Sequence, residues 1–181
     1  MLLIANRGNL FGRNPERENS PDYLNEAINQ GYHVMVDAWW VEGCFWFGKN
    51  HPTYKPIGGG MEWLSYAVNS VWIRAKSAET FVRAHDLGLN VFWQQSDMYA
   101  YSTWGHLLGF YGAAQAGDQF VHVVPAAEVV TVDSLEIDNM IRSAESSHAL
   151  CCDHVGAIVN HLLEPSCPHS DPRHISISQI A

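Results

Sequence analysis

The chain has 181 residues, within the range of one domain, and 47% of them are hydrophobic, enough for a substantial core. Its formal net charge of −9 argues against broad binding to nucleic acid or to an anionic membrane, because both need a basic face. No apolar run approaches the ~20 residues of a membrane span, and residues 1–4 are too short for the core of a signal peptide. We therefore expect a cytoplasmic protein with no membrane span.

The first half of the chain alternates short apolar runs with helix-like segments. Ser20 followed by Pro21 is typical of a helix start, and Gly31 of a helix end. In chain order we predict a strand at 2–5, a helix at 20–31, a strand at 32–38, a hairpin tip at 41–45, a loop at 56–60, a short helix at 61–69 and a strand at 71–75.

The second half continues the same alternation. Ser77 is expected to cap a helix, Asp133 with Glu136 resembles a capping box, and Asp153 is expected to cap the last helix. We predict strands at 90–93, 107–110, 120–124 and 149–152, and a loop that holds Tyr99 and Tyr101.

Strands that alternate with helices indicate parallel βαβ units. Seven strands, or eight, allow a small closed barrel or a doubly wound sheet. We predict an α/β fold, a short TIM-type (β/α) barrel, with residues 1–165 as one domain and residues 166–181 as a C-terminal tail.

In parallel α/β folds, the functional site lies at the carboxyl ends of the strands. This rule selects several polar side chains. Guanidinium and ammonium groups suit a phosphate or a carboxylate, although ordinary salt bridges at the barrel end would use the same residues. The residues selected are Asn6, Arg7, Asp37, Arg74, Lys76, Gln94 and Gln95.

At these positions the chain resembles a known family. The segments in question are Ile4-Ala5-Asn6-Arg7-Gly8-Asn9, Glu18-Asn19-Ser20, Met35-Val36-Asp37, Phe47-Gly48-Lys49-Asn50, Ile73-Arg74-Ala75-Lys76 and Phe92-Trp93-Gln94-Gln95-Ser96-Asp97. They resemble, in order, the "HRGN", "ENS", "ExD", "GHD", "ExK" and "FWHQxD" motifs of glycerophosphodiester phosphodiesterase-like proteins. The resemblance covers roughly residues 1 to 160 and implies a barrel of the phospholipase C-like phosphodiesterases.

The chain departs from this pattern where the family does its chemistry. Asn6 and Lys49 stand at the two histidine positions; asparagine cannot transfer a proton near neutral pH, and lysine could do so only with a strongly lowered pKa. Of the three metal-ligand positions, now Met35, Asp37 and Arg74, only Asp37 keeps a carboxylate. We therefore expect no cofactor, with weak binding of Mg²⁺ or Ca²⁺ at most.

The phosphate-holding part of the resemblance remains. We predict that Arg7, Glu18, Arg74, Lys76 and Gln94 bind a phosphorylated small molecule, with weak or no turnover by the family's route. One alternative is an active phosphodiesterase that uses Lys49 or His51 as the base. Another is a barrel that serves only as a scaffold or interaction module.

The cysteines and C-terminal histidines suggest a further alternative. Residues His148, Cys151, Cys152, His154, His161, Cys167 and His169 could supply zinc ligands, but no paired C-x₂-C unit is present. We interpret Cys44, Cys151, Cys152 and Cys167 as reduced thiols, because their spacing resembles no secreted disulfide scaffold.

Overall fold

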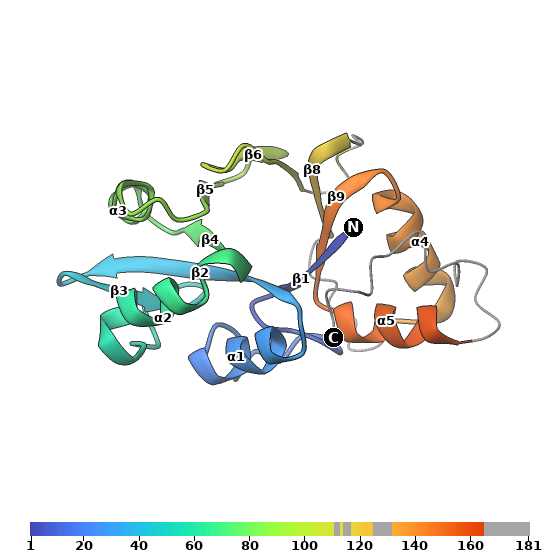
Figure 1. Ribbon diagram of the computed structural model, residues 1–181, viewed down its shortest axis with the longest axis horizontal. Coiled ribbons are helices and arrows are strands. Elements are labelled where there is room, and N and C mark those ends of the chain that lie inside the picture. The colour runs from blue at the N-terminus through green and yellow to red at the C-terminus, as the bar shows by residue number, and fades with distance from the viewer. Residues whose placement is uncertain (111–112, 114–116, 125–131, 165–181) are drawn as a thin grey trace.

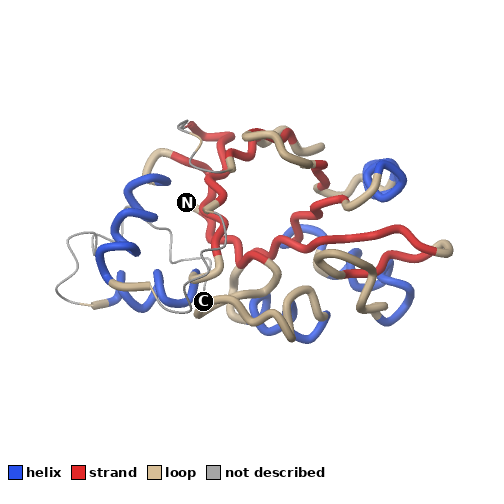
Figure 2. Tube along the Cα trace, turned by 180° about the vertical axis from the view of Figure 1, so that it is seen from behind, coloured by secondary structure: helices blue, strands red, loops and turns tan. Residues whose placement is uncertain are grey.

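The computed structural model of the protein describes residues 1–110, 113, 117–124 and 132–164. In this part of the chain, one mixed sheet curls into a nearly closed barrel with helices outside it (Figure 1). Figure 2 shows the ring of strands from behind. The predicted α/β class and short TIM-type barrel are confirmed, and the sheet is not an open doubly wound one. The predicted tail lies outside the described residues.

The bounds of most elements agree with the predicted ones to within a few residues. The strands are β1 (Leu2–Asn6), β2 (His33–Val41), β3 (Cys44–Phe47), β4 (Val71–Ala75), β5 (Val91–Trp93), β6 (Tyr99–Tyr101), β7 (Leu107–Gly109), β8 (Gly117–Val123) and β9 (Ser147–Cys152). The helices are α1 (Pro21–Asn29), α2 (Met61–Tyr66), α3 (Ala78–Asp86), α4 (Ser134–Ala144) and α5 (Val155–Leu163), with 3₁₀ turns at Ile57–Gly60 and Val68–Ser70.

Around the ring the strand order is β5-β4-β2-β1-β9-β8-β7-β6, and β3 forms a hairpin with β2 outside this path. The strands from β5 to β7 are parallel to their neighbours, whereas β6 is antiparallel to β7. Thr103 joins the two ends of the path: its N–H donates to the Val91 carbonyl (2.9 Å), and its hydroxyl accepts from the Val91 N–H (3.0 Å). These bonds bring the far ends of the sheet together.

The helix starts follow from local chemistry. The Ser20 hydroxyl accepts from the Tyr23 N–H with Pro21 in the first turn, and both halves of the capping box between Asp133 and Glu136 are present. Ser77 caps α3 as predicted, through the Thr80 N–H.

Three predictions about individual segments were wrong. The segment with Tyr99 and Tyr101 is a strand rather than a loop, because it pairs with β7 next to the place where the ring of strands closes. The helix predicted over residues 61–69 ends at Tyr66 and gives way to a 3₁₀ turn. Asp153 does not cap α5, since its side chain accepts hydrogen bonds from Asn6 of β1 and from Asn9 in the loop after β1 instead.

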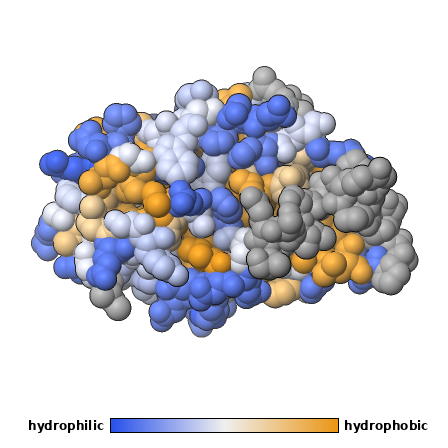
Figure 3. Space-filling model, viewed as in Figure 1, coloured by the Kyte–Doolittle hydropathy of each residue, from blue (hydrophilic) through white to orange (hydrophobic). Residues whose placement is uncertain are grey.

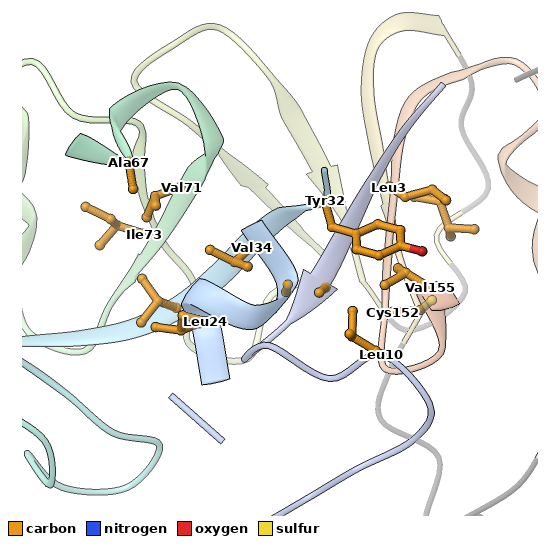
Figure 4. Packing of buried hydrophobic residues seen from close by; sticks show 14 of the residues in the cluster. Leu3, Leu10, Leu24, Tyr32, Val34, Ala67, Val71, Ile73, Cys152 and Val155 are labelled. Carbon is orange, nitrogen blue, oxygen red and sulfur yellow. The ribbon is translucent and has the colours of Figure 1, made fainter. Parts of the chain in front are cut away.

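Two apolar layers hold the barrel together. The inside of the ring is filled by a cluster that includes Ile4, Met35, Phe92 and Leu108, and side-chain atoms occupy the centre that the ribbon leaves open (Figure 3). A larger cluster packs the helices on the outside of the strands; Leu24 of α1, for example, lies near Val34 of β2 (Figure 4). Each fully buried large apolar side chain contributes roughly 1.5–3 kcal/mol.

Within the described part of the chain, no helix is long and apolar enough to cross a membrane.

Candidate functional site

The site begins where β1 ends, at Arg7. Its φ of 55° is in the left-handed region, which a residue with a side chain rarely adopts and which costs about 1–2 kcal/mol. The Arg7 N–H donates to the Met35 carbonyl (2.7 Å), and the Arg7 carbonyl accepts from the N–H of Asn19, which also has a positive φ, 67°. The surrounding backbone therefore holds this conformation, which turns the Arg7 side chain toward β2.

Asp37, near the middle of β2, is the centre of the site. Its side chain is fully buried and is enclosed by cations from two strands. Arg7 Nε lies 2.5 Å from Oδ2, Arg74 Nη1 lies 3.3 Å from Oδ1, and Lys76 Nζ lies 3.9 Å from Oδ1. Asn19 completes the shell, because its side-chain oxygen accepts from the Asp37 N–H (2.9 Å) and its amide lies 3.4 Å from Oδ2.

The charged groups of this network shift one another's pKa values. Burial alone would raise the pKa of Asp37, but Arg74, Arg7 and Lys76 outweigh it and hold this pKa below its ordinary value. Burial and the nearby cations Arg74, Arg7 and Lys49 lower the pKa of Lys76, although Asp37 acts against them. One carboxylate thus serves three cations, and the network carries an excess of positive charge.

Glu18 lies on the other side of Arg7. Its carboxylate is 3.6 Å from Arg7 Nη1 and 3.3 Å from Arg13 Nε, and it accepts from the Asn9 amide at 3.2 Å. Only 4% of the Glu18 side chain is exposed. The predicted ligand-binding residue Glu18 is therefore a buried partner of two arginines.

Asn6 faces a carboxylate that sequence reasoning did not select. Its amide donates to Asp153 Oδ1 at 2.9 Å, and the Asn9 amide donates to the same oxygen at 2.8 Å. Asn6 Oδ1 and Asp153 Oδ2 are buried and have no hydrogen-bond partner among the described residues. Asn6 is thus tied to the residue after β9, and its amide neither gains nor loses a proton near neutral pH.

The loop after β3 brings Lys49 and His51 to the same region. Phe47 pairs with Tyr54 by two backbone bonds, and the Gly48 N–H donates to the Asp37 carbonyl (3.0 Å). A Cβ at Gly48 would lie 2.1 Å from the His51 carbonyl oxygen, so only glycine allows the tight turn between Phe47 and Tyr54. Lys49 and His51 then line, with Glu18, a pocket of about 450 Å³.

The residues predicted at strand ends do not all converge. Arg7, Glu18, Asp37, Arg74 and Lys76 form one connected set, and Lys49 is close enough to lower the pKa of Lys76. Gln94 stands apart, because its amide donates to the Asp97 carbonyl (3.1 Å) in an exposed loop.

The metal position of the resembled family does not fit a divalent cation here. Both oxygens of Asp37 face cations, and Met35, beside it on β2, accepts a hydrogen bond from Arg74 through its sulfur (2.9 Å). A hard cation would need several oxygen ligands at the place that the Arg74 guanidinium fills. Nor do the described residues contain any group of three or more His, Cys, Asp or Glu able to hold a metal ion. Cys167 and His169, named in the zinc alternative, lie outside the described residues.

Sequence reasoning missed four polar residues of the site: Asn9, Arg13, Asn19 and Asp153. Asp153 could have been found, because it directly follows a predicted strand and the strand-end rule applies to it. Asn9 and Asn19 stand inside the quoted motifs. Arg13 had no signal, since it lies in a loop with no motif.

No protein-family model, curated protein or solved structure matches the chain. The resemblance to glycerophosphodiester phosphodiesterases therefore stays a prediction, and the function is inferred from the geometry of the site.

Proposed function

We propose that the barrel binds a phosphorylated small molecule at the carboxyl ends of β1, β2 and β4, as a phosphodiesterase-like protein with little or no turnover. The main support is the arrangement of Arg7, Arg74 and Lys76 around the single carboxylate of Asp37. Among the ion pairs of the described residues, Arg7 also pairs with Glu18, whereas Arg74 and Lys76 pair with Asp37 alone, which leaves positive charge that an anion can neutralise.

The residues around this network also carry more positive than negative charge. Five cations lie in the region, against four carboxylates, in a chain whose formal net charge is −9. The cations are Arg7, Arg13, Lys49, Arg74 and Lys76, and the carboxylates are Glu16, Glu18, Asp37 and Asp153. A local excess of one positive charge in an acidic protein favours an anionic ligand over a neutral one.

The two lysines are the better candidates for direct contact with a phosphate. The side chain of Lys76 is 27% exposed, whereas those of Arg7 and Arg74 are 9% and 11% exposed. Lys49 lines an open pocket with Arg13, Glu16 and Glu18, and its charge is close enough to lower the pKa of Lys76, which does not line that pocket. In this proposal the two arginines supply fixed positive charge from the buried side of the site, and Lys49 and Lys76 contact the phosphate oxygens.

The same geometry supports binding without cleavage by the family's route. Asn6 holds Asp153 and cannot act as an acid or base, and Asp37 is enclosed by cations where a metal would bind. We propose that no cofactor is needed and that Mg²⁺ or Ca²⁺ binds weakly at most. The free thiols of Cys44, Cys151 and Cys152 suit the cytoplasm that we propose as the location.

Calorimetry tests this proposal. We expect inorganic phosphate and glycerol 3-phosphate to bind with EDTA present, and glycerol to give no heat. Lys49→Gln should weaken binding, while Lys55→Gln, outside the network, should leave it unchanged. Equal affinities for glycerol and glycerol 3-phosphate, or binding that requires a divalent metal, would refute the proposal.

A rearranged phosphodiesterase is the second candidate, because Lys49 and His51 line one pocket with Glu18. Release of glycerol 3-phosphate from a glycerophosphodiester, abolished by His51→Ala, would favour it. If the protein neither binds phosphate nor cleaves the diester, the scaffold alternative remains.

A further inference from the structure

The chain has only three lysines, and their surroundings differ sharply. Lys76 directly follows β4, its N–H donates to the Ala38 carbonyl (3.0 Å), and its amine lies 3.9 Å from Asp37. Lys49 lines the open pocket, whereas the Lys55 amine lies over the ring of Trp46, 5.5 Å from the ring centroid. Lys76 alone combines partial burial with a place inside the cation network.

This environment acts against the protonated form of the Lys76 amine. Burial and the positive charges of Arg74, Arg7 and Lys49 lower its pKa, and Asp37 offsets them only in part because it also pairs with both arginines. The geometry points the same way, because the amine is partly buried among cations and Asp37, the carboxylate beside it, is shared with Arg7 and Arg74. A neutral lysine amine beside other cations is a nucleophile for carbonyl groups.

We propose that Lys76 forms a Schiff base with a phosphorylated aldehyde or ketone. The inference rests on the proposed function, since the same cations would hold the phosphate and bring the carbonyl carbon to the amine. The lone pair of Nζ attacks the carbonyl carbon and a C–N bond forms. The two protons of the amine pass to the carbonyl oxygen, which leaves as water, and a C=N bond remains. No electrons are gained or lost overall.

The position of Lys76 favours this chemistry. It stands at the carboxyl end of a barrel strand, the face where catalytic residues of such barrels lie, and about a quarter of its side chain is exposed to solvent. Arg74, two residues earlier on the same strand, is fixed by Asp37 and by the Met35 sulfur. A phosphate held by Lys49, with the fixed positive charge of Arg74 close by, would therefore lie next to the amine.

Pyridoxal 5′-phosphate is a suitable probe because it joins an aldehyde to a phosphate. The full-length protein is incubated with it, the imine is trapped with borohydride, and the modified peptide is identified by mass spectrometry. We expect modification of Lys76 in preference to Lys49 and Lys55, slower modification by pyridoxal, which lacks the phosphate, and protection by inorganic phosphate. The adduct should be lost in Lys76→Arg and retained in Lys55→Arg.

Modification spread equally over the lysines, or persisting at the same level in a folded Lys76→Arg variant, would overturn the inference. If Lys76→Arg does not fold, the peptide map of the unaltered protein decides by itself. Phosphate binding in the calorimeter without an adduct at Lys76 would overturn this inference and leave the proposed function standing. Equal modification by pyridoxal and by its phosphate, with no protection, would overturn both.

Discussion

Asp37→Asn is the substitution that most directly tests the described network. It removes the one carboxylate on which Arg7, Arg74 and Lys76 converge and changes the size of the side chain very little. Removing one partner of a buried ion pair costs about 3–5 kcal/mol, because the remaining charges stay buried without compensation. The free energy of unfolding of a domain is about 5–15 kcal/mol in total, so a loss of this size should be easily measured.

Urea unfolding at neutral pH measures this loss. Phosphate should restore part of the stability of Asp37→Asn and stabilise it more than it stabilises the unaltered protein, since the site has gained one positive charge. A ligand present at one hundred times its Kd contributes about 2.7 kcal/mol. Chloride at equal ionic strength controls for screening.

The contribution of Asp37 to the stability of the protein depends on pH with a definite sign. The folded pKa of Asp37 is below its ordinary value of 3.8, so its contribution is fully present above that value. It is lost only as the pH falls through the lower, folded pKa. Asp37→Asn should therefore differ from the unaltered protein most at neutral pH and least in strong acid.

Glu26→Gln is the matched control. Glu26 also pairs with an arginine, Arg17, at 2.6 Å, but both side chains are largely exposed, 49% and 42%. Its loss should change stability little. Equal effects of Glu26→Gln and Asp37→Asn, or a loss below about 1 kcal/mol for Asp37→Asn, would refute the role assigned to burial.

Three further predictions concern other parts of the barrel. The rings of His106 and His148 lie at the other end of the barrel, with their centroids 4.6 Å apart. Burial lowers the pKa of both histidines, and the charge of His148 lowers the pKa of His106 further. The unfolded chain then binds protons more readily, so the melting temperature should fall between pH ~7.5 and ~5.5, around the ordinary histidine pKa of about 6.5, and fall less in His148→Gln. Gly109→Ala should destabilise the protein by about 1–3 kcal/mol in urea, because a Cβ there would lie 2.3 Å from Phe120 Cζ. Cys152 is buried and its pKa is raised to about 12, so a thiol reagent should modify it only after unfolding, as peptide mapping would show.

Features that depend on neighbouring residues followed from the sequence. The N-cap of α1 and the capping box of α4 each join residues three apart, so the local pattern contained both partners. The polar residues after β1 and β4 could also be selected, because the strand-end rule needs only the strand and the residue that follows it.

What the sequence by itself determined is the alternation of strands and helices and a supply of cations at the strand ends. Only the tertiary structure decided that Arg74 and Lys76 share Asp37 with Arg7, that Gln94 stays apart, and that Asn6 binds Asp153, 147 residues away. The physical reason is that closing the ring brings together strand ends far apart in the chain, and no local pattern specifies which of them meet.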